Sequence, residues 1–130
     1  MRRRILFAED NVAMANVVKF RLKKAGFEVT HAPNGLEAWE HAQRASFDLV
    51  LSDHQMPLLS GIELCERLRE MEKFRATPII LLTAKQLELN RKSLEQQLQV
   101  SQIIAKPFSP NHLIETIAQQ LAALPVRGEW

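Results

Sequence analysis

The stretch Leu49-Val50-Leu51-Ser52-Asp53 decides the fold class of this chain. Three large aliphatic residues and one small residue follow each other without a charge, and the run ends at a carboxylate. A continuous apolar run of this length is typical of a strand that is buried on both faces of a parallel sheet. We therefore predict a central parallel strand over 49–52, with Asp53 at its carboxyl end.

Four further runs of strand character flank this stretch. The runs 5–8, 79–82 and 103–105 are also continuously apolar, whereas 27–32 alternates apolar and polar residues, as an edge strand does. Amphipathic segments with apolar residues at helical spacing separate the runs. These segments cover about 11–25, 36–45, 62–71, 87–98 and 113–124.

Strands that alternate with helices predict an α/β fold, a doubly wound five-stranded parallel sheet covered by five helices. The edge character of the second strand favours the strand order 2-1-3-4-5, an α/β/α sandwich. We expect one domain over 1–124, because Pro125 ends the last helix and 125–130 forms a short tail.

Composition sets limits on the class of function. The chain has 130 residues, a formal net charge of +2 and a single cysteine, Cys65. This charge gives no reason to expect nucleic-acid binding, and no stretch is long or apolar enough to cross a membrane. A lone cysteine excludes an internal disulfide, so we expect a cytoplasmic protein.

Polar residues with complementary chemistry follow four of the five apolar runs. Glu9 and Asp10 follow the first run, Asp53 the third, Thr83 the fourth and Lys106 the fifth. Parallel strands bring their carboxyl ends to one edge of the sheet, where α/β proteins build their sites. Any one of these residues is an ordinary solvated strand end by itself. Together they predict a site with three carboxylates, a hydroxyl and an ammonium.

Three carboxylates at one place repel each other, and a divalent cation relieves that repulsion. Oxygen ligands favour a hard ion such as Mg²⁺. One carboxylate can then attack phosphorus to form an aspartyl phosphate, while the metal, the threonine and the lysine spread the phosphoryl charge. The predicted chemistry is therefore phosphoryl transfer to Asp53.

With these residues in view, the chain from about residue 3 to 124 resembles the receiver domain of two-component response regulators, which has a flavodoxin-like fold. The resemblance is carried by Glu9-Asp10, Asp53-His54-Gln55-Met56-Pro57 with Gly61, Thr83-Ala84 and Lys106-Pro107-Phe108. It implies the following roles: Asp53 as phosphoacceptor, Asp10 as direct Mg²⁺ ligand, Glu9 as a ligand through water, the backbone carbonyl of Gln55 as a further ligand, Thr83 as switch hydroxyl and Lys106 as the lysine that pairs with the phosphoryl group. It also implies a cis peptide between Lys106 and Pro107.

The family implies a signal receiver rather than an enzyme with an external substrate. Its phosphodonor is a histidine kinase or a histidine phosphotransfer protein. Its output is an effector or a homodimer, bound through the face of the fourth helix, fifth strand and fifth helix. Two features depart from the family pattern: Ile103 stands where an aromatic switch residue is frequent, and the stretch 98–101 lacks the usual glycine.

Two other functions remain as alternatives. A receiver-like interaction module without phosphorylation is suggested by Ile103 and by the altered stretch 98–101, but the complete set of acids, threonine and lysine opposes it. An aspartyl-nucleophile phosphatase would resemble Asp-x-Asp, whereas Gln55 stands two residues after Asp53.

Overall fold

The computed structural model describes residues 2–84, 95–97 and 99–123. Strands and helices alternate along the chain, as the apolar runs predicted. The elements are β1 (Arg4–Ala8), α1 (Val12–Lys24), β2 (Glu28–Ala32), α2 (Gly35–Arg44), β3 (Leu49–Asp53), α3 (Gly61–Glu70), the short 3-10 helix η1 (Glu72–Phe74), β4 (Ile79–Thr83), β5 (Gln102–Ala105) and α5 (Pro110–Ala122).

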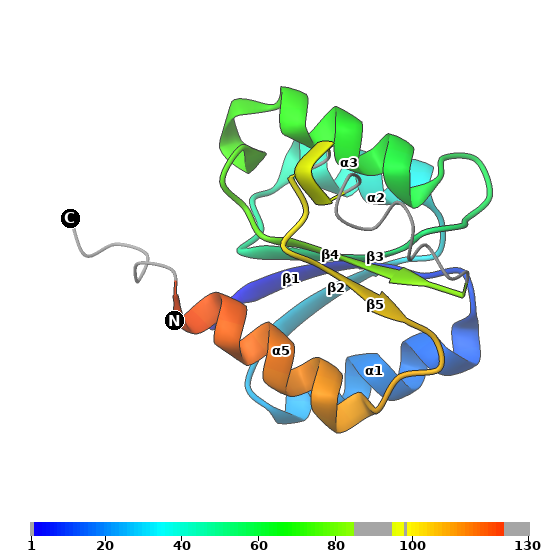
Figure 1. The fold of residues 1–130 in the computed structure, drawn as a ribbon, viewed down its shortest axis with the longest axis vertical. Coiled ribbons are helices and arrows are strands. Elements are labelled where there is room, and N and C mark those ends of the chain that lie inside the picture. Colours follow the sequence, from blue (N-terminus) through cyan, green and yellow to red (C-terminus); the bar gives the residue numbers. More distant parts are fainter. Residues whose placement is uncertain (1, 85–94, 98, 124–130) are drawn as a thin grey trace.

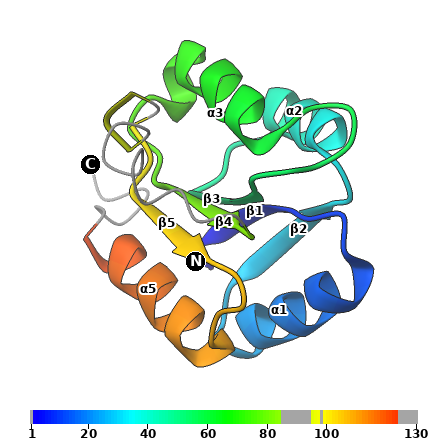
Figure 2. The ribbon, with the colours of Figure 1, turned by 45° about the vertical axis from the view of Figure 1, so that its right-hand side comes forward.

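The five strands form one parallel sheet in the order β2-β1-β3-β4-β5. Figure 1 shows α1 and α5 on one face of the sheet and α2 and α3 on the other, and Figure 2 shows the same layers after rotation. The predicted fold class and strand order are therefore confirmed. Of the fourth predicted helix, over about 87–98, the structure describes only 95–97, which are helical, and the predicted tail over 125–130 lies outside the described residues.

Burial explains the contrast between the apolar runs. All five residues of β3 and of β4 are buried, whereas β2 at the edge has one buried residue, Ala32. The core forms two clusters, one beneath α2 and α3 and one beneath α1 and α5. The sheet is thus covered by helices on both faces, so a site can form only at the ends of the strands.

Each described α-helix begins at a side chain that caps its first turn. Asn11 accepts a hydrogen bond from the Met14 N–H, and Asn34 accepts one from the Glu37 N–H. Ser60 exchanges hydrogen bonds with Glu63 in a capping box, and Ser109 caps α5. Three of these caps follow the carboxyl end of a strand by a few residues, so they also order the loops at that edge. Among the described residues, no helix is long and apolar enough to cross a membrane.

Candidate functional site

The ends of β1, β3, β4 and β5 lie level at the carboxyl edge of the sheet. The register pairs Ala8 with Ser52, Asp53 with Leu82, and Thr83 with Ala105. Glu9 and Lys106 each follow the last residue of a strand, and Asp53 and Thr83 are themselves last residues. The sheet therefore brings these four predicted site residues to one place from strands that are far apart in the sequence.

Lys106 joins two of the predicted carboxylates. Its Nζ lies 2.8 Å from Asp53 Oδ1 and 3.1 Å from Glu9 Oε1. The Glu9 and Asp53 side chains are 0% and 9% exposed, and that of Lys106 is 21% exposed. Buried charges need partners with good geometry, and this ammonium serves both carboxylates at once.

Three carboxylates form a cluster at the same edge. One oxygen from each of Glu9, Asp10 and Asp53 lies within 4.8 Å of the others, and Asp10 is exposed while the other two residues are buried. One ammonium compensates only part of three negative charges, so the donor set suits a hard divalent cation such as Mg²⁺. Gln55 lies two residues beyond Asp53 with an exposed side chain, and the role of its carbonyl as a metal ligand stays a prediction.

The electrostatics of Glu9 and Lys106 reflect this shared burial. Burial raises the pKa of the Glu9 carboxyl, and the charge of Asp53 adds to the rise, although the Asn11 N–H and Lys106 act against it. Burial by itself lowers the pKa of Lys106, but the hydrogen bonds and charges of Asp53 and Glu9 outweigh it, so that pKa lies above its ordinary value. The ammonium is therefore held in its charged form beside Asp53.

Backbone hydrogen bonds fix the residues that carry these charges. The Asn11 N–H donates to Glu9 Oε2 at 3.1 Å, and the Lys106 N–H donates to the Thr83 carbonyl at 2.7 Å. Thr83 is itself 2% exposed. The peptide bond between Lys106 and Pro107 is cis, as the resemblance implied.

Sequence reasoning missed two residues around Glu9. His31 Nε2 lies 2.8 Å from the Glu9 carbonyl oxygen, because β2 pairs His31 with Phe7 beside the end of β1. Asn11 both caps α1 and donates its N–H to the Glu9 side chain. The signal for Asn11 was visible, since an asparagine stands directly before a helix, but the contact of His31 depends on strand register.

Comparison with known proteins identifies the family of the chain. The sequence matches the response regulator receiver domain over residues 5–118. The chain belongs to this family. Curated relatives of the receiver domain include the alkaline phosphatase synthesis transcriptional regulatory protein PhoP of Bacillus subtilis, 34% identical over 87% of this chain and 46% of PhoP. ResD of the same species is 36% identical over 85% of this chain and 45% of ResD. The chain spans about half the length of the curated relatives it matches.

Solved structures show the same fold. The chemotaxis response regulator CheY4 of Vibrio cholerae superposes with a TM-score of 0.85 at 30% identity, over 92% of this chain and 99% of CheY4. The receiver domain of the sensor histidine kinase PA1611 of Pseudomonas aeruginosa has a TM-score of 0.84 at 30% identity, over 95% of this chain and all of that domain. The PA1611 domain holds a magnesium ion in its active-site cleft, which agrees with the acidic cluster of this receiver domain.

Two glycines let the starts of α2 and α3 pack directly against neighbouring backbone. A Cβ on Gly61 would lie 2.1 Å from the backbone oxygen of Asp53, and a Cβ on Gly35 would lie 1.9 Å from the backbone oxygen of Leu59. The Gly61 N–H donates to the His54 carbonyl at 2.9 Å. The start of α3 is thus packed directly against the backbone that carries Asp53.

The two departures from the family pattern have structural counterparts. Ile103 is 2% exposed and packs in the cluster beneath α2 and α3. Gln99 adopts a positive φ of 55°, a conformation that glycine takes without penalty. Its carbonyl accepts a hydrogen bond from Arg69 Nη2 at 2.6 Å. This turn is therefore held by a side chain from α3.

Proposed function

We propose that this receiver domain accepts a phosphoryl group on Asp53 in the presence of Mg²⁺ and thereby switches the surface it offers to an effector. The observation that supports this role is the 2.8 Å contact between Lys106 Nζ and Asp53 Oδ1 beside the cluster of three acids. In this proposal the receiver unit extends over 1–124.

In the proposed step, a carboxylate oxygen of Asp53 attacks phosphorus, and the bond from phosphorus to the donor nitrogen breaks. The imidazole of the donor leaves with the electron pair of that bond and takes a proton. Lys106 stays charged throughout and stabilises the negative charge that gathers on the phosphoryl oxygens. The raised pKa of Lys106 supports this assignment.

Glu9, Asp10 and Asp53, with the backbone carbonyl of Gln55, would hold the metal. Bound Mg²⁺ would neutralise phosphoryl oxygens and orient the group for in-line transfer. Thr83 ends β4 beside Lys106, since its carbonyl accepts the Lys106 N–H. We assign its hydroxyl to the phosphorylated state, in which it would bind a phosphoryl oxygen.

The donor in this proposal is a phosphohistidine of a histidine kinase or of a histidine phosphotransfer protein. The proposed output surface is the face of the fourth helix, β5 and α5, of which the structure describes β5, α5 and residues 95–97. The chain would act as a signal receiver, with only its own phosphorylation and dephosphorylation as chemistry.

Acetyl phosphate tests the proposal without a cognate kinase. We expect a phosphoryl adduct on the wild-type chain by intact-mass spectrometry when Mg²⁺ is present, and none with a chelator. Asp53→Asn should abolish the adduct, because the amide oxygen is a poor nucleophile, while its size preserves the fold. An undiminished adduct on Asp53→Asn would refute the assignment, and rapid turnover of phosphomonoesters would favour a phosphatase.

A further inference from the structure

The backbone just beyond β1 is held by the edge strand β2. The Glu9 N–H donates to the Ala32 carbonyl at 3.0 Å, and His31 Nε2 lies 2.8 Å from the Glu9 carbonyl oxygen. A carbonyl oxygen only accepts hydrogen bonds, so Nε2 of His31 carries a proton and is the donor. Both polar backbone groups of Glu9 are therefore bonded to the carboxyl end of β2, one of them through a side chain.

The carbonyl that His31 binds belongs to the peptide group between Glu9 and Asp10. A peptide group is planar, so a fixed position of its oxygen restricts the orientation of both residues that it joins. Each of these residues contributes a carboxylate oxygen to the acidic cluster with Asp53. One hydrogen bond from β2 thus acts on two of the three carboxylates at once.

The two carboxylates differ in how far they depend on that bond. The Glu9 side chain has contacts of its own, since Oε2 accepts from the Asn11 N–H and Oε1 lies 3.1 Å from Lys106 Nζ. The Asp10 side chain is exposed, and in the part of the chain that the structure describes no hydrogen bond or ion pair holds it. The place of the Asp10 carboxylate therefore follows from its backbone, which the His31 bond orients.

The imidazole of His31 has a rigid support. Strand register pairs His31 with Phe7, and the two ring centroids lie 5.7 Å apart at an angle of 47°. Phe7 is fully buried in the cluster beneath α1 and α5. Another aromatic ring would pack on Phe7 equally well, whereas the bond to the Glu9 carbonyl requires a side-chain donor. Packing on Phe7 alone therefore does not account for a histidine here.

We propose that His31 is a positioning residue for the metal site, whose Nε2–H orients the peptide between Glu9 and Asp10 so that the Asp10 carboxylate is already in place for a divalent cation. This inference rests on the proposed function, because it takes the acidic cluster to be the Mg²⁺ site. Ligands that are ordered beforehand lose less conformational freedom when the ion binds. Loss of the bond should therefore weaken the binding of the ion.

Two variants separate the hydrogen bond from the ring that makes it. His31→Phe keeps a ring against Phe7 and has no donor, whereas His31→Gln keeps a side-chain N–H of similar reach and loses the ring. His112→Phe is the matched control, because it makes the same chemical change at an exposed histidine on α5. Phenylalanine is favourable in strands, so we expect His31→Phe to stay folded, which circular dichroism checks.

Mn²⁺ is the probe, because it takes the same oxygen ligands as Mg²⁺, and the free ion is quantified by electron paramagnetic resonance. Loss of a group that orients a metal ligand typically costs about 10–100-fold in affinity, so we expect His31→Phe to bind Mn²⁺ about tenfold more weakly, and His31→Gln and His112→Phe to stay within about twofold of the wild type. Competition by added Mg²⁺ should give the same order. In the metal-free chain, the amide nitrogen signal of Asp10 should shift in His31→Phe and stay near its wild-type position in His31→Gln, because that nitrogen belongs to the bonded peptide.

Equal affinity of His31→Phe and the wild type would overturn the proposal. A loss in His31→Gln as large as that in His31→Phe would also overturn it, because the ring would then be responsible. Adding acetyl phosphate and Mg²⁺ to the same proteins distinguishes this inference from the proposed function. A wild-type chain that binds Mn²⁺ in a His31-dependent manner and takes up no phosphoryl group would refute the proposed function alone. Phosphorylation with equal ion affinities would refute the role of His31 alone, and a wild-type chain that binds no ion would refute both.

Discussion

Replacing Gly61 with alanine should disable the site through a contact of the backbone. The added Cβ would lie 2.1 Å from the carbonyl oxygen of Asp53, whereas ordinary contacts begin at 3.4 Å. The start of α3 and the backbone of Asp53 must therefore separate by about 1.3 Å, the difference of these two distances. Neither side is the flexible end of a side chain, so the displacement reaches the site.

The displacement has a predictable cost in rate. Asp53 Oδ1 lies 2.8 Å from Lys106 Nζ, and the Gly61 N–H bonds to the carbonyl of His54, the next residue. A misplacement of about 1 Å in a reacting group can cost about 100-fold in rate. We expect phosphorylation of Gly61→Ala by acetyl phosphate to fall by about that factor, and the free energy of unfolding to fall by about 1–3 kcal/mol from overpacking.

Two other glycines make this prediction sharp. Gly26 has a φ of +98° with nothing within 4 Å of an added Cβ. Gly26→Ala should therefore lose about 1–2 kcal/mol of stability and keep the wild-type phosphorylation rate. Gly35→Ala would collide with the backbone of Leu59 in the loop that follows Asp53, so it should resemble Gly61→Ala in milder form.

Thermal unfolding and the rate of phosphorylation by acetyl phosphate should be measured on all three variants. Together they distinguish backbone strain at a positive φ from displacement of Asp53. Without the collision, alanine is the better helix former by about 1 kcal/mol, so a more stable Gly61→Ala would refute the reasoning. A wild-type phosphorylation rate in that variant would refute it equally.

Three further predictions concern the stability of the fold. Arg69→Met should lower the free energy of unfolding by about 2–4 kcal/mol in urea titrations, because the guanidinium donates to several backbone carbonyls, including that of Gln99 at 2.6 Å. Adding Gln99→Gly to that variant should restore about 1 kcal/mol, because glycine relieves the strain of the positive φ at this position. A further loss of stability in the double variant would contradict this expectation. Lys106→Met should raise the pKa of Glu9 further, because Lys106 opposes the rise. The native state of the variant then keeps the Glu9 proton over a wider pH range above the ordinary pKa of 4.5. The free energy of unfolding of the variant should therefore fall more steeply with rising pH above 4.5 than that of the wild type. Parallel curves of stability against pH would contradict this expectation. Leu58→Gly should raise the melting temperature, with a gain of up to about 1 kcal/mol, because Leu58 is 74% exposed at a φ of 72°; a lower melting temperature would count against strain at this position.

The sheet and the position of the site followed from one local rule. An apolar run that stops at a polar residue marks both a buried strand and its end, so Asp53 and Thr83 could be placed at one edge before any contact was known. The edge position of β2 also followed, because the alternation of apolar and polar residues over 27–32 is typical of a strand that is partly exposed. Both properties depend on residues that are adjacent in the chain, so the sequence was sufficient to predict them.

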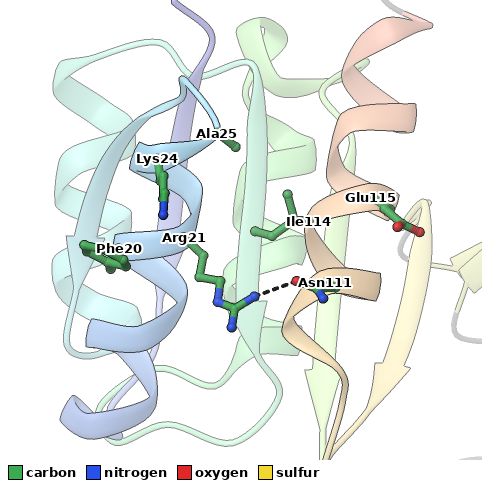
Figure 3. A pocket seen from close by; sticks show the side chains of 7 residues that line it. All are labelled: Phe20, Arg21, Lys24, Ala25, Asn111, Ile114 and Glu115. Atoms are coloured by element: carbon green, nitrogen blue, oxygen red, sulfur yellow. Dashed lines mark hydrogen bonds between the residues drawn. The ribbon is translucent and has the colours of Figure 1, made fainter.

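Other contacts depend on distances that no local pattern contains. The bond between Arg69 and Gln99 joins residues thirty positions apart, and the missing glycine at 98–101 indicated only that the turn was unusual. The approach of Gly35 to Leu59 depends on how α2 packs against the loop after β3. The hydrogen bond from Arg21 to Asn111 likewise joins two helices, α1 and α5, that are far apart in the chain (Figure 3).

The absence of an aromatic residue at Ile103 bears on how a signal would leave the site. Ile103 is 2% exposed within the cluster beneath α2 and α3, so a large rotation of its side chain is sterically opposed. The strand that carries it is tied at both ends: the Lys106 N–H bonds Thr83, and the Ser101 N–H bonds Ile79 at 2.7 Å. Arg69 also donates a hydrogen bond to the carbonyl of Gln99, in the turn that precedes the strand. In the proposed phosphorylated state, movement of Thr83 toward the phosphoryl group would therefore pull on the Lys106 end of β5 while the other end stays anchored. We expect β5 to tilt as a unit in that state.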